Sequence, residues 1–187
     1  MKNSLHLQVI TYTLMTDKKE KILQSALVLF ANEGVSATST NKIAKLAGVS
    51  EGLIFRHYKS KKGLLNAIIE NAEQKVNILF GDIMMQTDPK SVILKTIEFP
   101  FLIKKSEYNY WKLQFKLKWE EEYNNPNKMK PLLDKLTWAF TQLNYDFPAL
   151  EAQYMLQTLE SISTEILKGN LTNQQQFKQF LIHKYSA

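Results

Sequence analysis

The amino-acid sequence predicts an all-α protein of about nine helices, on three observations. Apolar residues recur at three- and four-residue spacing through nearly the whole chain, no useful run alternates with period two, and helix-capping residues return at intervals. The chain has 187 residues, of which 44% are hydrophobic and 22% charged, so it can bury a sizeable core. This composition excludes the disordered and fibrous classes.

A first helix is predicted from Asp17, because Glu20 follows at the spacing of a capping box and Gly34 is placed to end the helix. The organised pattern begins after Met15, so residues 1–14 are expected to form a flexible extension. The inward face of this helix is expected to consist of Ile22, Leu23, Ala26, Leu27 and Phe30.

Two short helices are predicted next, separated by Gly48. Ser39 is placed to cap the first and Ser50 to cap the second. The side chains expected to face inward are Ile43, Leu46 and Ala47, then Val49, Ile54 and Tyr58. Two short helices joined by a glycine turn indicate a helix-turn-helix.

A longer fourth helix, capped by Ser60, is predicted to connect this region to the rest of the chain. Its inward face should contain Leu64, Leu65, Ile68, Ile69, Val76 and Leu79. Pro100 is expected to kink or break the next helix. Cap signals at Asp88, Ser106, Asn125, Pro148 and Thr172 predict five more helices, near residues 89–104, 107–122, 127–143, 148–168 and 173–185.

The positive charge of the chain is concentrated near its N-terminus. Nine bases and four acids lie between Asp17 and Leu65, which gives this stretch 9 − 4 = +5 of the total net charge of +6. A basic segment on a nearly neutral body is typical of nucleic-acid binding, although a solvated charged surface would give the same count. The absence of cysteine excludes disulfides and thiolate metal sites and suits a reducing cytoplasm, and no apolar run reaches the length of about 20 residues that a membrane helix needs.

Residues 16–68 read "TDKKEKILQSALVLFANEGVSATSTNKIAKLAGVSEGLIFRHYKSKKGLLNAI" and resemble the DNA-binding region of the TetR family of bacterial transcriptional regulators. The resemblance implies a repressor that binds a palindromic DNA operator as a two-fold homodimer and is released by a small effector. It implies a helix-turn-helix DNA-binding domain over residues 15–65, and a helical effector-binding and dimerisation domain over residues 66–187.

Candidate DNA contacts lie on both short helices. Ser39 and Thr40, at the start of the first, suit a phosphate, and Asn41 lies where the family often has a polar or basic contact. Arg56 is the candidate for reading guanine, with a phosphate contact or a solvated side chain as alternatives. The resemblance makes Lys61 a candidate phosphate ligand.

The remaining candidates on the second short helix have less certain roles. Gly52 would allow close approach of the backbone to the groove, and Leu53 would meet a thymine methyl, although the family more often has threonine there. Phe55 replaces the usual tyrosine and can only pack on the sugar-phosphate backbone. Glu51 either accepts from cytosine or favours the helix N-terminus, with the second preferred, and His57 either donates to phosphate or packs at the surface.

In the C-terminal part, an aromatic face suggests an effector pocket for a hydrophobic or aromatic molecule, and its alternative is ordinary core packing. The candidate pocket residues are Phe99, Phe101, Tyr108, Trp111, Phe115 and Trp119. The candidate dimer interface, whose alternative is an intramolecular core, consists of Met155, Leu159, Ile162, Ile166, Phe177, Phe180 and Leu181.

An enzyme is not predicted, because the three histidines lie far apart and the sequence has no Walker loop, HExxH or GxSxG motif. No cofactor and no metal are predicted. The alternative within binding proteins is a TetR-like factor that binds DNA without a small-molecule effector.

Overall fold

The computed structural model describes residues 2–120, 122–123, 125 and 127–186, and within these the side chains of residues 2–16 and 72–79 lie outside the description. The described residues form nine α-helices and two 3-10 turns, with no strand among them, which confirms the all-α prediction. The chain divides into two compact units, residues 1–73 and 74–187.

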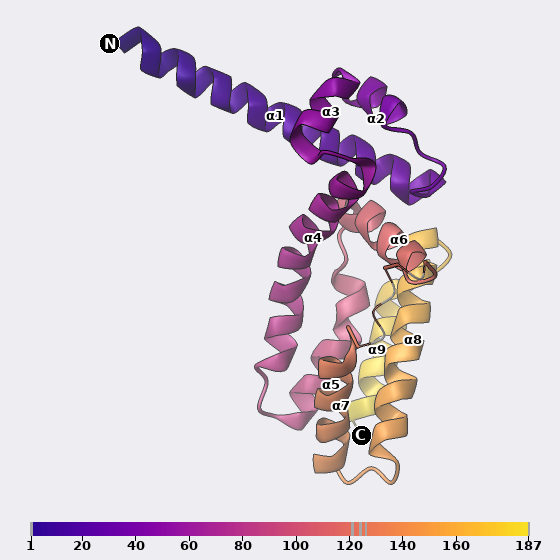
Figure 1. Ribbon diagram of the computed structural model, residues 1–187. Helices are drawn as coiled ribbons and strands as arrows, with labels where there is room; N and C mark the ends of the chain where they lie inside the picture. The colour runs from indigo at the N-terminus through magenta and orange to yellow at the C-terminus, as the bar shows by residue number, and fades with distance from the viewer. Residues whose placement is uncertain (1, 121, 124, 126, 187) are drawn as a thin grey trace. The chain divides into compact units, whose positions relative to one another are not determined.

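The N-terminal unit consists of α1 (Lys2–Glu33), α2 (Thr40–Ala47), α3 (Glu51–Tyr58) and the first part of α4 (Lys61–Met84), as Figure 1 shows. Helix α2 packs against both α1 and α3. The core of this unit is formed by fully or nearly fully buried side chains from all four helices: Ile22, Ala26, Phe30, Ile43, Ala44, Ile54, Leu64 and Leu65.

Caps and glycine turns set the helix boundaries of this unit largely as expected. The Ser39 hydroxyl accepts from the backbone N–H of Lys42, at 3.1 Å, and so caps α2. Gly34 ends α1 with φ +92°, and Gly48 ends α2 in the left-handed conformation. The Ser60 hydroxyl accepts from the N–H of Gly63, at 3.0 Å, at the start of α4.

Three local expectations for this unit are wrong or incomplete. Helix α1 begins at Lys2, so Asp17 lies inside it and pairs with Lys21 at 2.7 Å instead of capping the helix. The expected flexible extension therefore lies within the bounds of α1. Leu46 is 55% exposed, whereas Ala44 is buried in its place, because the buried side of α2 is formed by Ile43, Ala44 and Ala47. The side chains of Val76 and Leu79 lie outside the described residues.

The C-terminal unit contains the end of α4, α5 (Pro89–Glu98), the 3-10 turns η1 (Phe99–Leu102) and η2 (Lys105–Glu107), α6 (Tyr108–Leu117), α7 (Lys130–Gln142), α8 (Pro148–Lys168) and α9 (Gln174–Ser186). Helix α7 packs against α5 and α8, and α5 also contacts α9. Their shared core is apolar and includes Val92, Ile93, Leu136, Phe140, Ala152, Met155 and Ile166.

Two cap predictions in this unit are confirmed, and one is wrong. Asp88 caps α5 by accepting from the N–H of Ser91 at 2.8 Å, and Gly169 ends α8 with φ +80°. Pro100 follows the end of α5 and lies in the 3-10 turn η1, as the expected break requires. Ser106 lies inside η2 and does not cap α6, which begins two residues later and is shorter than predicted.

Candidate nucleic-acid interface

Helix α3 is anchored on one side and open on the other. Ile54 is fully buried, and the Tyr58 hydroxyl donates to the backbone carbonyl of Lys19 in α1 at 3.3 Å. On the other side, Gly52 and Arg56 are exposed and Phe55 is 45% exposed. The same eight-residue helix is therefore fixed to the core and still presents three of its candidate contact residues to solvent.

Gly52 has no side chain, so the backbone of α3 is accessible at this position on its outward face. A Cβ built at this position would meet no protein atom within 4 Å, so nothing inside the chain requires glycine there. Glycine inside a helix costs about 1 kcal/mol relative to alanine. An external partner that approaches the backbone closely would explain a residue that the fold itself does not need.

The first turn of α2 is linked to the first turn of α3 through Glu51. The Thr40 hydroxyl donates to one carboxylate oxygen of Glu51, and the Asn41 amide donates to the other at 3.5 Å. Sequence reasoning missed this bridge, because it placed Thr40 and Asn41 against DNA and gave Glu51 a role at its own helix terminus. Nothing in the local pattern marks a contact between residues ten and eleven positions apart.

Lys61 forms hydrogen bonds within the N-terminal unit. Its ammonium donates to the backbone carbonyls of Val35 at 2.8 Å and Thr38 at 3.0 Å, with Ser36 at 3.4 Å. The three hydrogens of a lysine ammonium are thereby directed at the loop between α1 and α2. In this arrangement the residue expected to bind phosphate instead fixes the loop that leads into α2.

His57 is held close to positive charge. Its Nε2 atom is covered and has no hydrogen-bond partner among the described residues. Desolvation lowers the pKa of the imidazole below its usual value, and the positive charges of Lys19, Arg56 and Lys59 lower it further. The ring is therefore neutral near pH 7, and the covered Nε2 atom is not placed to meet a phosphate.

Several bases of the N-terminal stretch are already paired. Lys42 forms an ion pair with Glu33 at 2.6 Å, and Lys21 pairs with Asp17. With the described residues, four bases make neither an ion pair nor a side-chain hydrogen bond: Lys18, Lys19, Lys45 and Arg56.

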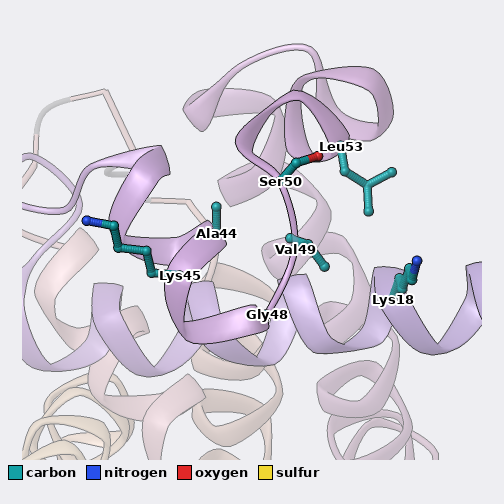
Figure 2. A pocket seen from close by; sticks show the side chains of 7 residues that line it. All are labelled: Lys18, Ala44, Lys45, Gly48, Val49, Ser50 and Leu53. Atoms are coloured by element: carbon teal, nitrogen blue, oxygen red, sulfur yellow. The ribbon is translucent and has the colours of Figure 1, made fainter.

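A basic hollow of about 400 Å³ lies beside the turn between α2 and α3. Figure 2 shows Lys45 and Lys18 at opposite ends of the hollow, with Ser50 and Leu53 along one side and Gly48 at the turn. The side chain of Ser50 makes no capping hydrogen bond, so its hydroxyl is available to a ligand. Leu53 lines this hollow, a location that could not be predicted from its position in the sequence.

Comparison with known proteins agrees with this geometry. Residues 22–68, which contain α2, α3 and the beginning of α4, match the family described as bacterial regulatory proteins of the tetR family. The N-terminal domain belongs to the TetR family.

Individual relatives of the TetR-family domain are similar over the same region. The HTH-type transcriptional regulator AcrR of Shigella flexneri is 43% identical over 63 residues, which are 34% of this chain and 29% of AcrR. The nucleoid occlusion factor SlmA of Vibrio cholerae is 39% identical over 71 residues, covering 35% of this chain and 36% of SlmA. The match thus spans about a third of the length of these curated relatives.

Solved structures of transcriptional regulators resemble the fold of nearly the whole chain. A TetR-like regulator from Rhodococcus sp. RHA1 has a TM-score of 0.75 at 14% identity and covers 90% of this chain and 91% of its own. FadR of Bacillus subtilis, solved in complex with stearoyl-CoA, has a TM-score of 0.65 at 20% identity, with 89% and 96% covered. At these identities the likeness establishes the fold.

The candidate effector residues in the C-terminal unit do not all come together. Phe99 contacts Trp111 edge to face, with ring centroids 5.4 Å apart, and also contacts Phe80 at 5.1 Å. Phe101 and Tyr108 pack against the helical core. The ring of Phe115 lies under the ammonium of Lys118, at 6.0 Å.

Trp119 is 92% exposed, so its place in the predicted pocket is wrong. The physical reason is that α6 ends at Leu117, and the continued helical spacing that aligned Trp119 with Trp111 does not exist.

The candidate dimer residues are divided between the core and the surface. Five of them are buried within the single chain and cannot form a free interface there: Met155, Leu159, Ile162, Ile166 and Leu181. Phe177 is partly buried against the same core, and Phe180 is 58% exposed. Helical periodicity identified an apolar face but could not tell that α5 and α7 cover it.

No described helix is long and apolar enough to span a membrane. Among the described residues, no three His, Cys, Asp or Glu side chains are grouped so that they could hold a metal ion.

Proposed function

We propose that this protein is a DNA-binding transcriptional regulator, most simply a repressor, whose helix α3 enters the major groove of a palindromic operator. The observation that carries the proposal is the open face of α3, where Gly52, Phe55 and Arg56 are exposed on a helix whose other side is fixed in the core of a TetR-family domain. In helix-turn-helix proteins the second helix reads base edges while the first crosses the backbone. No catalytic role is included in the proposal.

The unpaired bases divide between two tasks. Arg56 lies on the exposed face of α3, and its guanidinium can donate two parallel hydrogen bonds to O6 and N7 of guanine. Lys18 and Lys45 lie beside the turn, at the two ends of the basic hollow, where phosphates are the expected partners. Base contacts determine sequence preference, and phosphate contacts supply affinity that does not depend on sequence.

Selection from random-sequence duplexes, read by sequencing, tests the proposal directly. The expected result is an inverted repeat whose half-site centres are separated by about one helical turn, on the order of 34 Å, or somewhat more. Recovery of no enriched sequence would refute the proposal that the chain is an operator-binding regulator.

Two substitutions test the division of tasks on the selected site. Arg56→Ala should relax the preference at one base position, at a cost of about 1–3 kcal/mol for the preferred base. Lys45→Ala should weaken selected and random duplexes alike and reduce the salt slope by about 1. Lys105→Ala, which removes an exposed charge from the C-terminal unit, is the matched control and should change neither. Identical losses for Arg56→Ala and Lys45→Ala on both kinds of DNA would contradict the division.

We also propose that the regulator acts as a homodimer through exposed apolar side chains of α8 and α9. Leu150, Tyr154 and Phe180 are each more than half exposed; Phe180 is one of the predicted interface residues, and Leu150 and Tyr154 take the place of those that are buried. Size-exclusion chromatography with light scattering should give a dimer at micromolar concentration. The double variant Leu150→Glu/Phe180→Glu should give a monomer with weakened operator binding, and a wild-type monomer with full operator affinity would exclude the dimer.

A hydrophobic or aromatic effector is proposed to bind near Phe99 and Trp111, whose rings are in contact in the C-terminal unit. A ligand shifts a conformational equilibrium only by its different affinity for the two states, so an effector must bind the DNA-free conformer more tightly. Thermal-shift screening with aromatic compounds and with stearoyl-CoA, the ligand held by Bacillus subtilis FadR, should find molecules that lower operator affinity.

Trp111→Ala should abolish the thermal shift that these compounds cause. Hits that stabilise Trp111→Ala as strongly as the wild type, or that leave operator affinity unchanged, would place the switch elsewhere.

A further inference from the structure

Glu51 is the one acidic residue within α2 and α3, and it lies at the edge of the surface that should face DNA. Its two carboxylate oxygens receive hydrogen bonds from Thr40 and Asn41, the first two residues of α2. It makes no ion pair with the described residues, so its negative charge is held by neutral donors only. Of the two lysines in α2, Lys42 is paired with Glu33.

The donors that Glu51 occupies are those that a phosphate would use. A helix N-terminus with hydroxyl and amide side chains in its first turn is a favourable place for an anion. Here the carboxylate of the neighbouring helix occupies that place. A phosphate that approached Thr40 and Asn41 would have to displace Glu51 and would meet its negative charge.

We propose that Glu51 is a specificity-determining residue of the DNA-contact surface, which withholds Thr40 and Asn41 from phosphates and so weakens binding to random DNA more than binding to the operator. The inference rests on the proposed DNA-binding function. Specificity is a difference between two affinities, and a repulsive group raises it when the preferred complex can offset the repulsion and the others cannot. On the operator, base contacts such as that of Arg56 hold α3 in one register, in which Glu51 avoids a phosphate, whereas random DNA fixes no such register.

Two simpler roles explain less of the geometry. A carboxylate that only favoured the N-terminus of α3 would not need both oxygens directed at α2. A carboxylate that only accepted from cytosine would use the second lone pair of one oxygen, and it would not account for the hydrogen bonds that both oxygens receive from α2. The bridge between the two helices is therefore the feature to be tested.

Three variants separate the charge of Glu51 from the bridge that it forms. Glu51→Gln removes the negative charge and keeps an oxygen that can accept from Thr40. Glu51→Ala removes the charge and the bridge together. Thr40→Val keeps the charge and removes the hydroxyl donor, so it loosens the α2–α3 link without releasing a group to phosphate.

The readout is the dissociation constant for the selected operator and for a random duplex of equal length, by fluorescence anisotropy at two salt concentrations. Glu51→Gln should bind random DNA roughly tenfold more tightly than the wild type at low salt, with a smaller gain at higher salt, because removal of a like charge relieves a screened repulsion. The ratio of random to operator dissociation constants should fall for Glu51→Gln and Glu51→Ala. Thr40→Val should give no gain on random DNA.

If Glu51 only stabilised the fold, its replacement would lower the thermal stability and the affinity for both kinds of DNA. The affinity for random DNA would then fall, whereas the inference expects it to rise. The inference would be overturned if Glu51→Gln kept the wild-type ratio of random to operator dissociation constants. It would also be overturned if Thr40→Val gained as much affinity for random DNA as Glu51→Gln. A loss confined to one base position would assign Glu51 to base reading instead. If the wild type selects no sequence at all, the proposed function fails and this inference fails with it, whereas a selecting wild type with an unchanged Glu51→Gln ratio overturns the inference alone.

Discussion

Gly63 lies where the first turn of α4 passes over the end of α3, and its replacement by alanine should destabilise the N-terminal unit. A Cβ at this position would lie 2.1 Å from the carbonyl oxygen of Tyr58 and 3.2 Å from its carbonyl carbon. Real Cβ contacts are not this short, and a backbone carbonyl cannot swing aside as a flexible side chain would. The junction between α3 and α4 must therefore move.

The expected magnitude follows from two opposing terms. Overpacking a well-packed site costs about 1–3 kcal/mol, and a backbone obstacle places this case near the upper end. Alanine in place of glycine inside a helix returns about 1 kcal/mol. The net loss should be about 2 kcal/mol, and for a unit of this size each kcal/mol lowers the melting temperature by about 4–8 °C.

Hydrogen exchange read by mass spectrometry can follow the two units separately. Gly63→Ala should reduce protection in α2, α3 and the start of α4, while the fluorescence of the three Trp residues, all in the C-terminal unit, should stay as in the wild type. Gly81→Ala is the matched control in the same helix, because its added Cβ meets nothing within 4 Å, and it should be neutral or stabilising. Unchanged protection in Gly63→Ala would refute the steric argument.

Three further changes test the candidate interface. Gly52→Ala should stabilise the N-terminal unit by up to about 1 kcal/mol, because its added Cβ meets no protein atom. The same variant should weaken operator binding in anisotropy titrations, because the DNA groove approaches the backbone at this position. Lys61→Met should lower stability by about 1–2 kcal/mol in urea melts through loss of its carbonyl contacts, with an unchanged operator-to-random ratio. The lowered pKa of His57 means that the unfolded chain binds more protons below pH 6.5, so stability should fall as pH drops from 6.5, and urea melts of His57→Gln should show a shallower fall.

Helix existence and most caps could be predicted from the sequence because both depend on neighbours within four residues. Ser39, Ser60 and Asp88 cap the helices expected of them, since each oxygen reaches an N–H three residues ahead. Asp17 was misread because the pattern before it was taken as unstructured. Leu46 was misread because an eight-residue helix offers too few turns to decide between two adjacent apolar faces.

Roles that depend on distant partners were not predictable in the same way. Lys61 contacts carbonyls 23 and 26 residues earlier in the chain, and Glu51 contacts α2 across the turn, so neither partner is visible in local spacing. The helical spacing of Met155 and Ile166 is the same whether they form a dimer interface or an intramolecular core. Only the positions of α5 and α7 distinguish the two. The exposure of Gly52 and Arg56 could be predicted more easily, because the burial of Ile54 alone fixes the orientation of so short a helix.

The net charge of the N-terminal stretch overstates the number of phosphates that the domain can neutralise. Nine bases lie between Asp17 and Leu65, and if each bound a phosphate, the logarithm of the association constant would fall against the logarithm of salt concentration with a slope of about −8 per protomer. Lys21 and Lys42 are already paired with acids, Lys59 and Lys61 donate to backbone carbonyls, and Lys62 also has a contact within the chain. The four uncommitted bases, Lys18, Lys19, Lys45 and Arg56, predict a slope of about −4 per protomer on random DNA. Titrations between about 50 and 200 mM salt can separate these values. A slope near −8 would mean that the internal pairs open on binding, and the assignment of Lys42 and Lys61 to the fold would then be wrong.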